Sequence, residues 1–156
     1  MRNKQKGFSL IELLIVVAII LIIAAIAIPN LLRSKIAANQ ASAVGSLRSL
    51  NTACIAYSTS YGSFPTALTN LGPVGSSGTA SSTSADLIDS VLAAGTKSGY
   101  TFVFTAGSSN QSYSITSTPI TAATTGQNMY YTDQSGVIRV DTSGSSASSA
   151  STPIGN

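Results

Sequence analysis

Few side chains in this sequence of 156 residues could do chemistry. There is no histidine, which excludes the usual Ser-His-Asp and Cys-His forms of nucleophilic catalysis. No cluster of histidine and cysteine could hold zinc, and no glycine-rich phosphate loop precedes an expected helix. Asp86 and Asp89 are more typical of a capped, solvated helix end than of a metal site. The sequence therefore predicts a protein that is not an enzyme, with no catalytic residue, no metal and no cofactor.

One acidic residue lies in an unusual place. Glu12 is the only charged residue between Phe8 and Ile28, and every residue from 13 to 28 is apolar. As a helix, this stretch would be about 32 Å long, close to the hydrocarbon core of a bilayer. A carboxylate inside lipid costs up to about 3 kcal/mol. Glu12 therefore either has a functional partner or lies near the helix end and reaches the headgroups.

The residues before this stretch are basic. Arg2, Lys4 and Lys6 account for three of the eight basic residues, so removing residues 1–7 leaves five basic and five acidic side chains. Basic residues beside an apolar segment hold that end in the cytoplasm, and we expect the other end to face outward. A nucleic-acid site would need clustered basic residues on the folded domain, and none is evident.

Three interpretations of the apolar stretch compete. A secretory signal peptide could be cleaved near Ala25-Ile-Ala27, but the apolar run is long for one and contains Glu12. A plain single-span anchor fits the length but does not explain the acid. The third interpretation depends on the residues around Gly7.

The run Lys6-Gly-Phe-Ser-Leu-Ile-Glu12, with residues 13–20 and 24–29 after it, resembles the processing site of type IV pilins and type II secretion pseudopilins. The resemblance covers most of the first thirty residues. It implies that a membrane peptidase cuts after Gly7, that Phe8 becomes the N-methylated terminus, and that Glu12 is used in filament assembly.

The pattern after residue 29 is that of a long helix with one apolar face. Apolar residues recur every three or four positions, at Ile36, Ala43, Val44, Leu47, Leu50, Cys54, Tyr57 and Tyr61. The opposite side carries Arg33, Lys35, Asn39, Gln40, Arg48, Ser49 and Asn51. We expect Pro29 to kink the junction and Gly62 to end the helix. Cys54, the only cysteine, should be a small buried hydrophobe.

Strand patterns follow in the C-terminal third. Alternating residues predict strands over 100–105, 113–118, 129–132 and 137–141, a meander with one face covered by the helix. Ser84 is expected to cap a short helix with Asp86 in its first turn. Many type IV pilins carry a C-terminal disulfide loop, which this chain lacks. Strand pairing alone must then hold its C-terminal region.

Together these patterns predict an α+β fold, in which a long N-terminal helix packs its second half on a small antiparallel sheet. The expected segments are a removed leader at 1–7, a transmembrane and filament-core helix at 8–29, and its amphipathic continuation at 30–62. A loop with a short helix follows at 63–99, then the sheet at 100–141 and a flexible Ser/Thr-rich tail at 142–156.

The resemblance implies a structural subunit of a type IV pilus. Its precursor would lie in the bacterial inner membrane with a cytoplasmic N-terminus, and its partners would be other copies, a prepilin peptidase and methylase, and the inner-membrane assembly machinery. The alternative is the major pseudopilin of a type II secretion system, in a periplasmic pseudopilus. A further alternative is a single-span membrane-anchored domain that never assembles.

Overall fold

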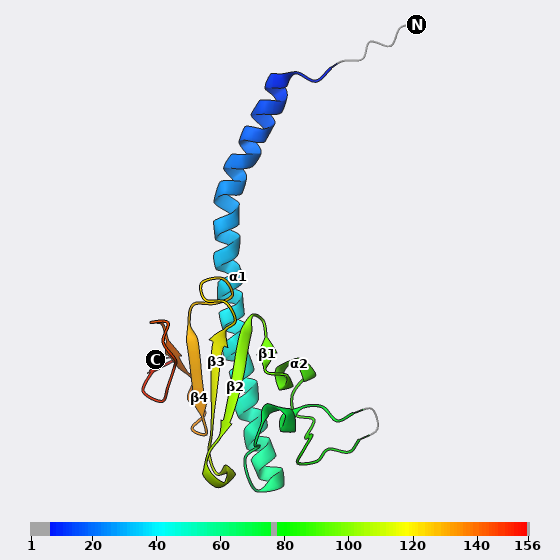
Figure 1. Ribbon diagram of the computed structural model, residues 1–156, viewed down its shortest axis with the longest axis vertical. Helices are drawn as coiled ribbons and strands as arrows, with labels where there is room; N and C mark the ends of the chain where they lie inside the picture. The colour runs from blue at the N-terminus through cyan, green and yellow to red at the C-terminus, as the bar shows by residue number, and fades with distance from the viewer. Residues whose placement is uncertain (1–6, 76–77, 156) are drawn as a thin grey trace. The chain divides into compact units, whose positions relative to one another are not determined.

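The structure, a computed structural model, describes residues 7–75 and 78–155 (Figure 1). The expected leader therefore lies outside the described residues except for Gly7. Two compact units are present, Met1–Lys35 and Ile36–Asn156, and each is described by itself. Helix α1, Leu10–Tyr61, contributes residues to both units.

The first unit consists of the apolar part of α1. This helix is long and apolar enough to cross a membrane by length and composition, and none of its most apolar window is buried against the rest of the chain. Helix is the expected form, because backbone N–H and C=O groups in lipid must be paired within the segment. The helix continues through Pro29, and the kink expected there stays a prediction.

The second half of α1 uses its apolar stripe as the sequence predicts. Ala43, Leu47, Leu50, Cys54 and Tyr57 are all buried. Fully burying a leucine side chain is worth about 1.5–3 kcal/mol, so this stripe supplies much of the stability of the helix on its sheet.

Helix α1 ends where the sequence predicts. Gly62 adopts a φ of +78°, a conformation that residues with a Cβ rarely adopt. Its N–H donates to the Ser58 carbonyl at 2.9 Å, which satisfies one of the last carbonyl groups of the helix.

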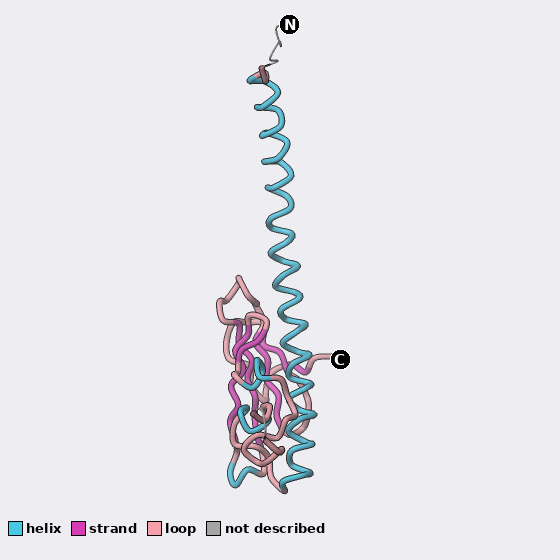
Figure 2. Tube along the Cα trace, turned by 90° about the vertical axis from the view of Figure 1, so that its right-hand side faces the viewer, coloured by secondary structure: helices cyan, strands magenta, loops and turns pink. Residues whose placement is uncertain are grey.

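The second unit holds a six-stranded antiparallel sheet whose spatial order follows the sequence. The strands are β1 (Thr96–Lys97), β2 (Tyr100–Ala106), β3 (Tyr113–Pro119), β4 (Met129–Asp133), β5 (Arg139–Asp141) and β6 (Thr152–Pro153). They lie along one side of α1 (Figure 2). The predicted α+β class is confirmed.

Alternate residues of the central strands fill the space beneath the helix. Tyr100 and Phe102 of β2, Ile115 of β3 and Tyr130 of β4 are at most 4% exposed. The residues between them are more exposed, as expected for a sheet with one covered face. This alternation is the signal from which the strands were predicted.

The sheet extends beyond the predicted bounds of 100–141. Strand β1 precedes it, and β6 lies in the segment expected to be a flexible tail. Besides the pairing of β6 with β5, two bonds hold this end: the Ile154 N–H donates to the Ile138 carbonyl at 2.8 Å, and Arg139 Nη1 donates to the Ser151 carbonyl at 3.0 Å. Strand β5 in turn begins at Arg139, two residues later than expected. The two-residue strands β1 and β6 are too short to show alternation, so the sequence did not reveal them.

The connection between α1 and the sheet contains a short 3-10 helix, η1 (Leu68–Leu71), and helix α2 (Ser90–Ala93). Helix α2 begins later than the sequence suggests. The predicted cap at Ser84 is wrong, because Asp89 caps α2 by accepting the Leu92 N–H at 2.9 Å. Asp86 has a φ of 56°, and its N–H donates to the Gly72 carbonyl instead of entering a helix.

Candidate functional site

The Gly7–Phe8 bond lies in a short non-helical segment that directly precedes α1. The Phe8 side chain is 82% exposed, and nothing lies within 4 Å of the position that a Cβ on Gly7 would occupy. A peptidase needs an accessible backbone outside a helix at the bond it cleaves, and this exposed, non-helical segment meets that need. Cleavage after Gly7 and methylation of Phe8 stay predictions.

Glu12 has a partner within its own chain. The backbone N–H of Ser9, the residue just before α1, donates to Glu12 Oε2 at 2.9 Å. The Leu13 N–H in turn donates to the Ser9 carbonyl at 3.3 Å. A carboxylate in the first helical turn also interacts favourably with the helix dipole. The predicted site residue Glu12 therefore also fixes where α1 begins.

This contact was not predicted, although the Ser-x-x-Glu spacing of Ser9 and Glu12 is a known signature of a helix start. The contact occupies Oε2 alone among the residues that the structure describes. A second donor could therefore bind the carboxylate at Oε1. The charged amine that cleavage would create at Phe8 has the right chemistry for this.

Pro29 lies inside α1, far along the helix from Glu12. Proline has no N–H, so the Ala25 carbonyl lacks its usual intrahelical donor. The structure thus brings Gly7, Phe8 and Glu12 together at the start of α1 and leaves Pro29 apart from them.

Asn51 was expected on the polar face of the helix, and this is wrong. Asn51 is only 7% exposed, and its side-chain Nδ2 donates to Thr132 Oγ1 on β4 at 2.8 Å. The Tyr113 hydroxyl on β3 donates to Asn51 Oδ1 at 3.1 Å. The covered face of α1 is wider than the apolar stripe, because polar partners on the sheet satisfy the amide.

Cys54 lies one turn further along the same face and is fully buried, as predicted. Burial raises the pKa of its thiol to about 12. The thiol therefore stays protonated and unreactive in the folded protein.

Asp89 is paired with a basic side chain. Asp89 Oδ2 contacts Lys97 Nζ at 2.8 Å, and the hydrogen bond from Lys97 holds the pKa of Asp89 below its usual value. Among residues 7–75 and 78–155, no group of three or more His, Cys, Asp or Glu side chains is close enough to hold a metal ion.

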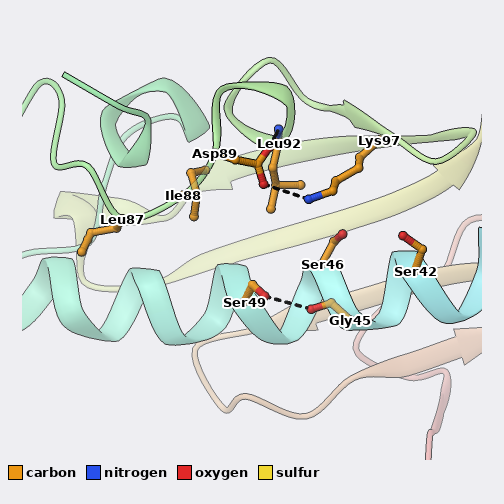
Figure 3. Close-up of a pocket in the computed structure, with 9 residues that line it drawn as sticks. All are labelled: Ser42, Gly45, Ser46, Ser49, Leu87, Ile88, Asp89, Leu92 and Lys97. Atoms are coloured by element: carbon orange, nitrogen blue, oxygen red, sulfur yellow. Dashed lines mark hydrogen bonds and ion pairs between the residues drawn. The ribbon is translucent and has the colours of Figure 1, made fainter. Parts of the chain in front are cut away.

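A cleft of about 500 Å³ lies between α1 and α2 (Figure 3). One wall presents the hydroxyl groups of Ser42, Ser46 and Ser49 from α1. The Asp89–Lys97 pair lies on the other wall. The Asp89 carboxylate of this cleft is engaged by Lys97 Nζ and by the Leu92 N–H.

Comparison with known proteins points to the start of α1. Residues 2–28 match the family model described as the prokaryotic N-terminal methylation motif. The chain is 52% identical over 50 residues to the type IV major pilin protein PilA of Myxococcus xanthus, a match covering 32% of this chain and 23% of the relative. It is 67% identical over 39 residues to the type IV wide pilus major component PilA4 of Thermus thermophilus. This match covers 25% of this chain and 29% of the relative.

A third relative comes from a secretion system. The chain is 36% identical over 70 residues to the type II secretion system core protein G of Escherichia coli, covering 45% of this chain and 47% of the relative. In each case the match spans less than half of the relative's length. No solved structure matches the chain. In its N-terminal motif the chain is similar to prepilin-type pilins and pseudopilins, and its helix-on-sheet fold is consistent with that similarity.

Proposed function

We propose that this chain is a structural subunit of a type IV pilus. The observation that carries the proposal is an exposed Gly7–Phe8 bond directly before a helix whose only charge among its first nineteen residues is Glu12. Two relatives named as major pilus components support it. In this role residues 1–7 are removed by a prepilin peptidase, and Phe8 becomes the methylated terminus.

Assembly uses the apolar part of α1. As a precursor, the chain lies in the bacterial inner membrane with its N-terminus in the cytoplasm, where lipid covers this segment. In the filament, the same segments of other copies replace lipid. The exchange of one apolar environment for another costs little, and close packing between helices stabilises the product. The inner-membrane assembly machinery would carry out this transfer.

A pseudopilus is the second candidate, favoured by the likeness to a type II secretion core protein. The subunit would then assemble in the periplasm and serve secretion. A membrane-anchored domain that never assembles is the remaining alternative, and it would retain residues 2–7 in the mature chain.

Two measurements on cells with and without the chain test these proposals. Electron micrographs should show long surface filaments that disappear with the chain. Mass spectra of the N-terminal peptide from isolated filaments should show methylated Phe8. Loss of secretion without loss of surface filaments would instead indicate the pseudopilus. A mature chain that begins at Met1 or Ile28 would overturn the pilin proposal.

A further inference from the structure

A hollow of about 240 Å³ lies at one end of the sheet, beside the turns that join β2 to β3 and β4 to β5. We call it the Asp133 hollow. Its walls are formed by the ends of these strands, which are neighbours in the sheet (Figure 1), and by the two turns. The polar side chains that line it are Thr105, Ser112, Ser114, Tyr131, Asp133 and Gln134.

Strand pairing aligns several of these side chains on one face of the sheet. Thr105 pairs with Ser114, and Ser114 pairs with Asp133 in the antiparallel register. The Cβ atoms of residues paired in this way are about 4.5–5.5 Å apart. Tyr131 precedes Asp133 by two residues and therefore projects from the same face. The alternate residues of these strands are the buried ones, so the four side chains lie on the face that α1 leaves open.

The carboxylate of Asp133 is held in a fixed orientation, because Oδ1 accepts the Ser135 N–H at 2.9 Å. A carboxylate offers about four acceptor positions, so it can still accept hydrogen bonds from the hydroxyl groups of a ligand. Tyr131 lies close to it: partial burial, and then the Asp133 carboxylate, raise the pKa of Tyr131. The phenol therefore stays protonated and can donate at neutral pH.

The composition of the hollow selects the class of ligand. Among the described residues that line it, Asp133 is the one charged side chain, and a negative charge disfavours phosphate, sulfate and carboxylate ligands. Hydroxyl and amide groups line most of the remainder, which does not suit a lipid chain. The volume is below the roughly 300–1,000 Å³ of sites for drug-sized ligands. These properties suit one sugar ring, whose hydroxyls bind polar groups while its C–H face packs on an aromatic ring.

We propose that the Asp133 hollow binds a single neutral sugar residue of a saccharide chain. The Tyr131 ring packs against the C–H face of the sugar, and the Asp133 carboxylate accepts hydrogen bonds from two adjacent hydroxyl groups. This inference goes beyond the proposed function, because the hollow belongs to the second unit and does not depend on filament assembly. In a filament, many copies of the site would strengthen attachment to one saccharide chain through multivalency.

Binding of the full chain to a saccharide array tests the site. The chain is kept in a zwitterionic detergent, because the headgroup of a maltoside detergent is itself a sugar and would compete. The array carries neutral pyranosides and acidic pyranosides. We expect binding to one or more neutral pyranosides, and we expect the free methyl glycoside of the same sugar to reverse it.

Variants assign the binding to the hollow. Asp133→Asn and Tyr131→Ala should each weaken binding by at least about tenfold, whereas Tyr131→Phe keeps the ring and should stay within about threefold of the wild type. Asp141→Asn is the matched control and should bind normally. Asp141 lies on β5, accepts the Ser143 N–H at 2.8 Å, and is outside the set of residues that line the hollow. Circular dichroism shows whether each variant is folded.

A folded wild-type chain that binds no neutral pyranoside would overturn this inference. Equal losses in Asp133→Asn and Asp141→Asn would also overturn it, and so would a preference for acidic sugars. Electron micrographs score filament formation separately. A chain that binds the sugar but forms no filaments would contradict the proposed function and leave this inference standing.

Discussion

The Asn51 side chain on α1 donates to the Thr132 hydroxyl on β4 at 2.8 Å, inside an otherwise apolar interface. Tyr113 on β3 donates to the same amide, so one helical residue joins two strands. Apolar contacts alone tolerate small slips of a helix along a sheet. A buried amide with directional partners does not tolerate such a slip, because polar groups would be left unpaired.

Replacing Asn51 with alanine should destabilise the second unit by about 1–3 kcal/mol, because the Tyr113 hydroxyl and Thr132 Oγ1 lose a buried partner. Denaturant unfolding followed by circular dichroism measures this. Thr52→Ala is the matched control, since Thr52 is exposed and its hydroxyl bonds only the Arg48 carbonyl of its own helix. Its effect should stay within about 0.5 kcal/mol. Equal losses in the two variants would contradict this role for Asn51.

A chain that begins at Ala37 should fold as a soluble monomer. The second unit is compact by itself, and the apolar segment that requires lipid or other copies is removed. Size-exclusion chromatography and circular dichroism test this. Persistent aggregation without a folded signal would show that the stripe of α1 does not pack stably on its own sheet.

The sequence predicted the elements that have a long periodic pattern. The apolar span, the stripe from Ala43 to Tyr57, the stop at Gly62 and the four main strands could all be recognised because several turns or alternations repeat the same signal. Strand β6 and the burial of Asn51 could not, because they depend on contacts with distant segments. The cap at Asp89 is local, but Ser84 offers a similar capping side chain five residues earlier. At the candidate site, the Ser9–Glu12 contact is local and had a visible spacing signal.

Stability should fall as pH rises above about 9. The folded state holds the Cys54 thiol proton to a pKa of about 12, whereas the ordinary pKa is 9.0. Burial raises the pKa of Tyr100 in the same way, from 10.0 to about 12. The unfolded chain therefore releases protons that the folded chain retains, and the free energy of unfolding decreases with pH in this range.

The alkaline loss has two parts that a variant can separate. Cys54→Ala should remove the part that begins near pH 9 and leave the part from about pH 10, to which Tyr100 and the other tyrosines whose pKa burial raises, Tyr113 and Tyr130 among them, contribute. The slope of unfolding free energy against pH is compared, because the smaller side chain also changes the absolute stability. An unchanged slope near pH 9 would mean that the thiol is not desolvated.

The apolar half of α1 should stay helical in the filament at residues 21–24. Leu21 is followed by Ile22, Ile23 and Ala24, with no glycine to weaken the helix, and all four are helical here. Any break should be confined to the turn between Ala25 and Pro29, where the proline removes an N–H. Leu21→Gly should lower local helix stability by about 1 kcal/mol. A filament map with residues 21–24 extended in the wild-type chain would contradict this expectation.

Glu12 provides the sharpest test of the assembly role. Cleavage after Gly7 would create a positive amine at Phe8, one helical turn away and at the positive end of the α1 dipole. An unpaired charge in a dry helical core costs several kcal/mol, and a close carboxylate offsets much of that. Ser9 occupies Oε2 of Glu12, so the other oxygen can accept from the amine of the same copy or of a neighbour. We favour the neighbour, because that contact would set the axial position of each incoming subunit.

Glu12→Leu should leave membrane insertion and cleavage largely intact and should abolish or misregister assembly. Glu12→Gln should be milder, because the amide oxygen can still accept the Ser9 N–H and the incoming donor. Ile11→Leu is the control, since it alters an adjacent apolar side chain and keeps the acid. Mass spectra report cleavage, and electron micrographs report filament yield. Normal filaments at normal yield from Glu12→Leu would show that Glu12 only marks the start of the helix, as its bond with Ser9 does in the single chain.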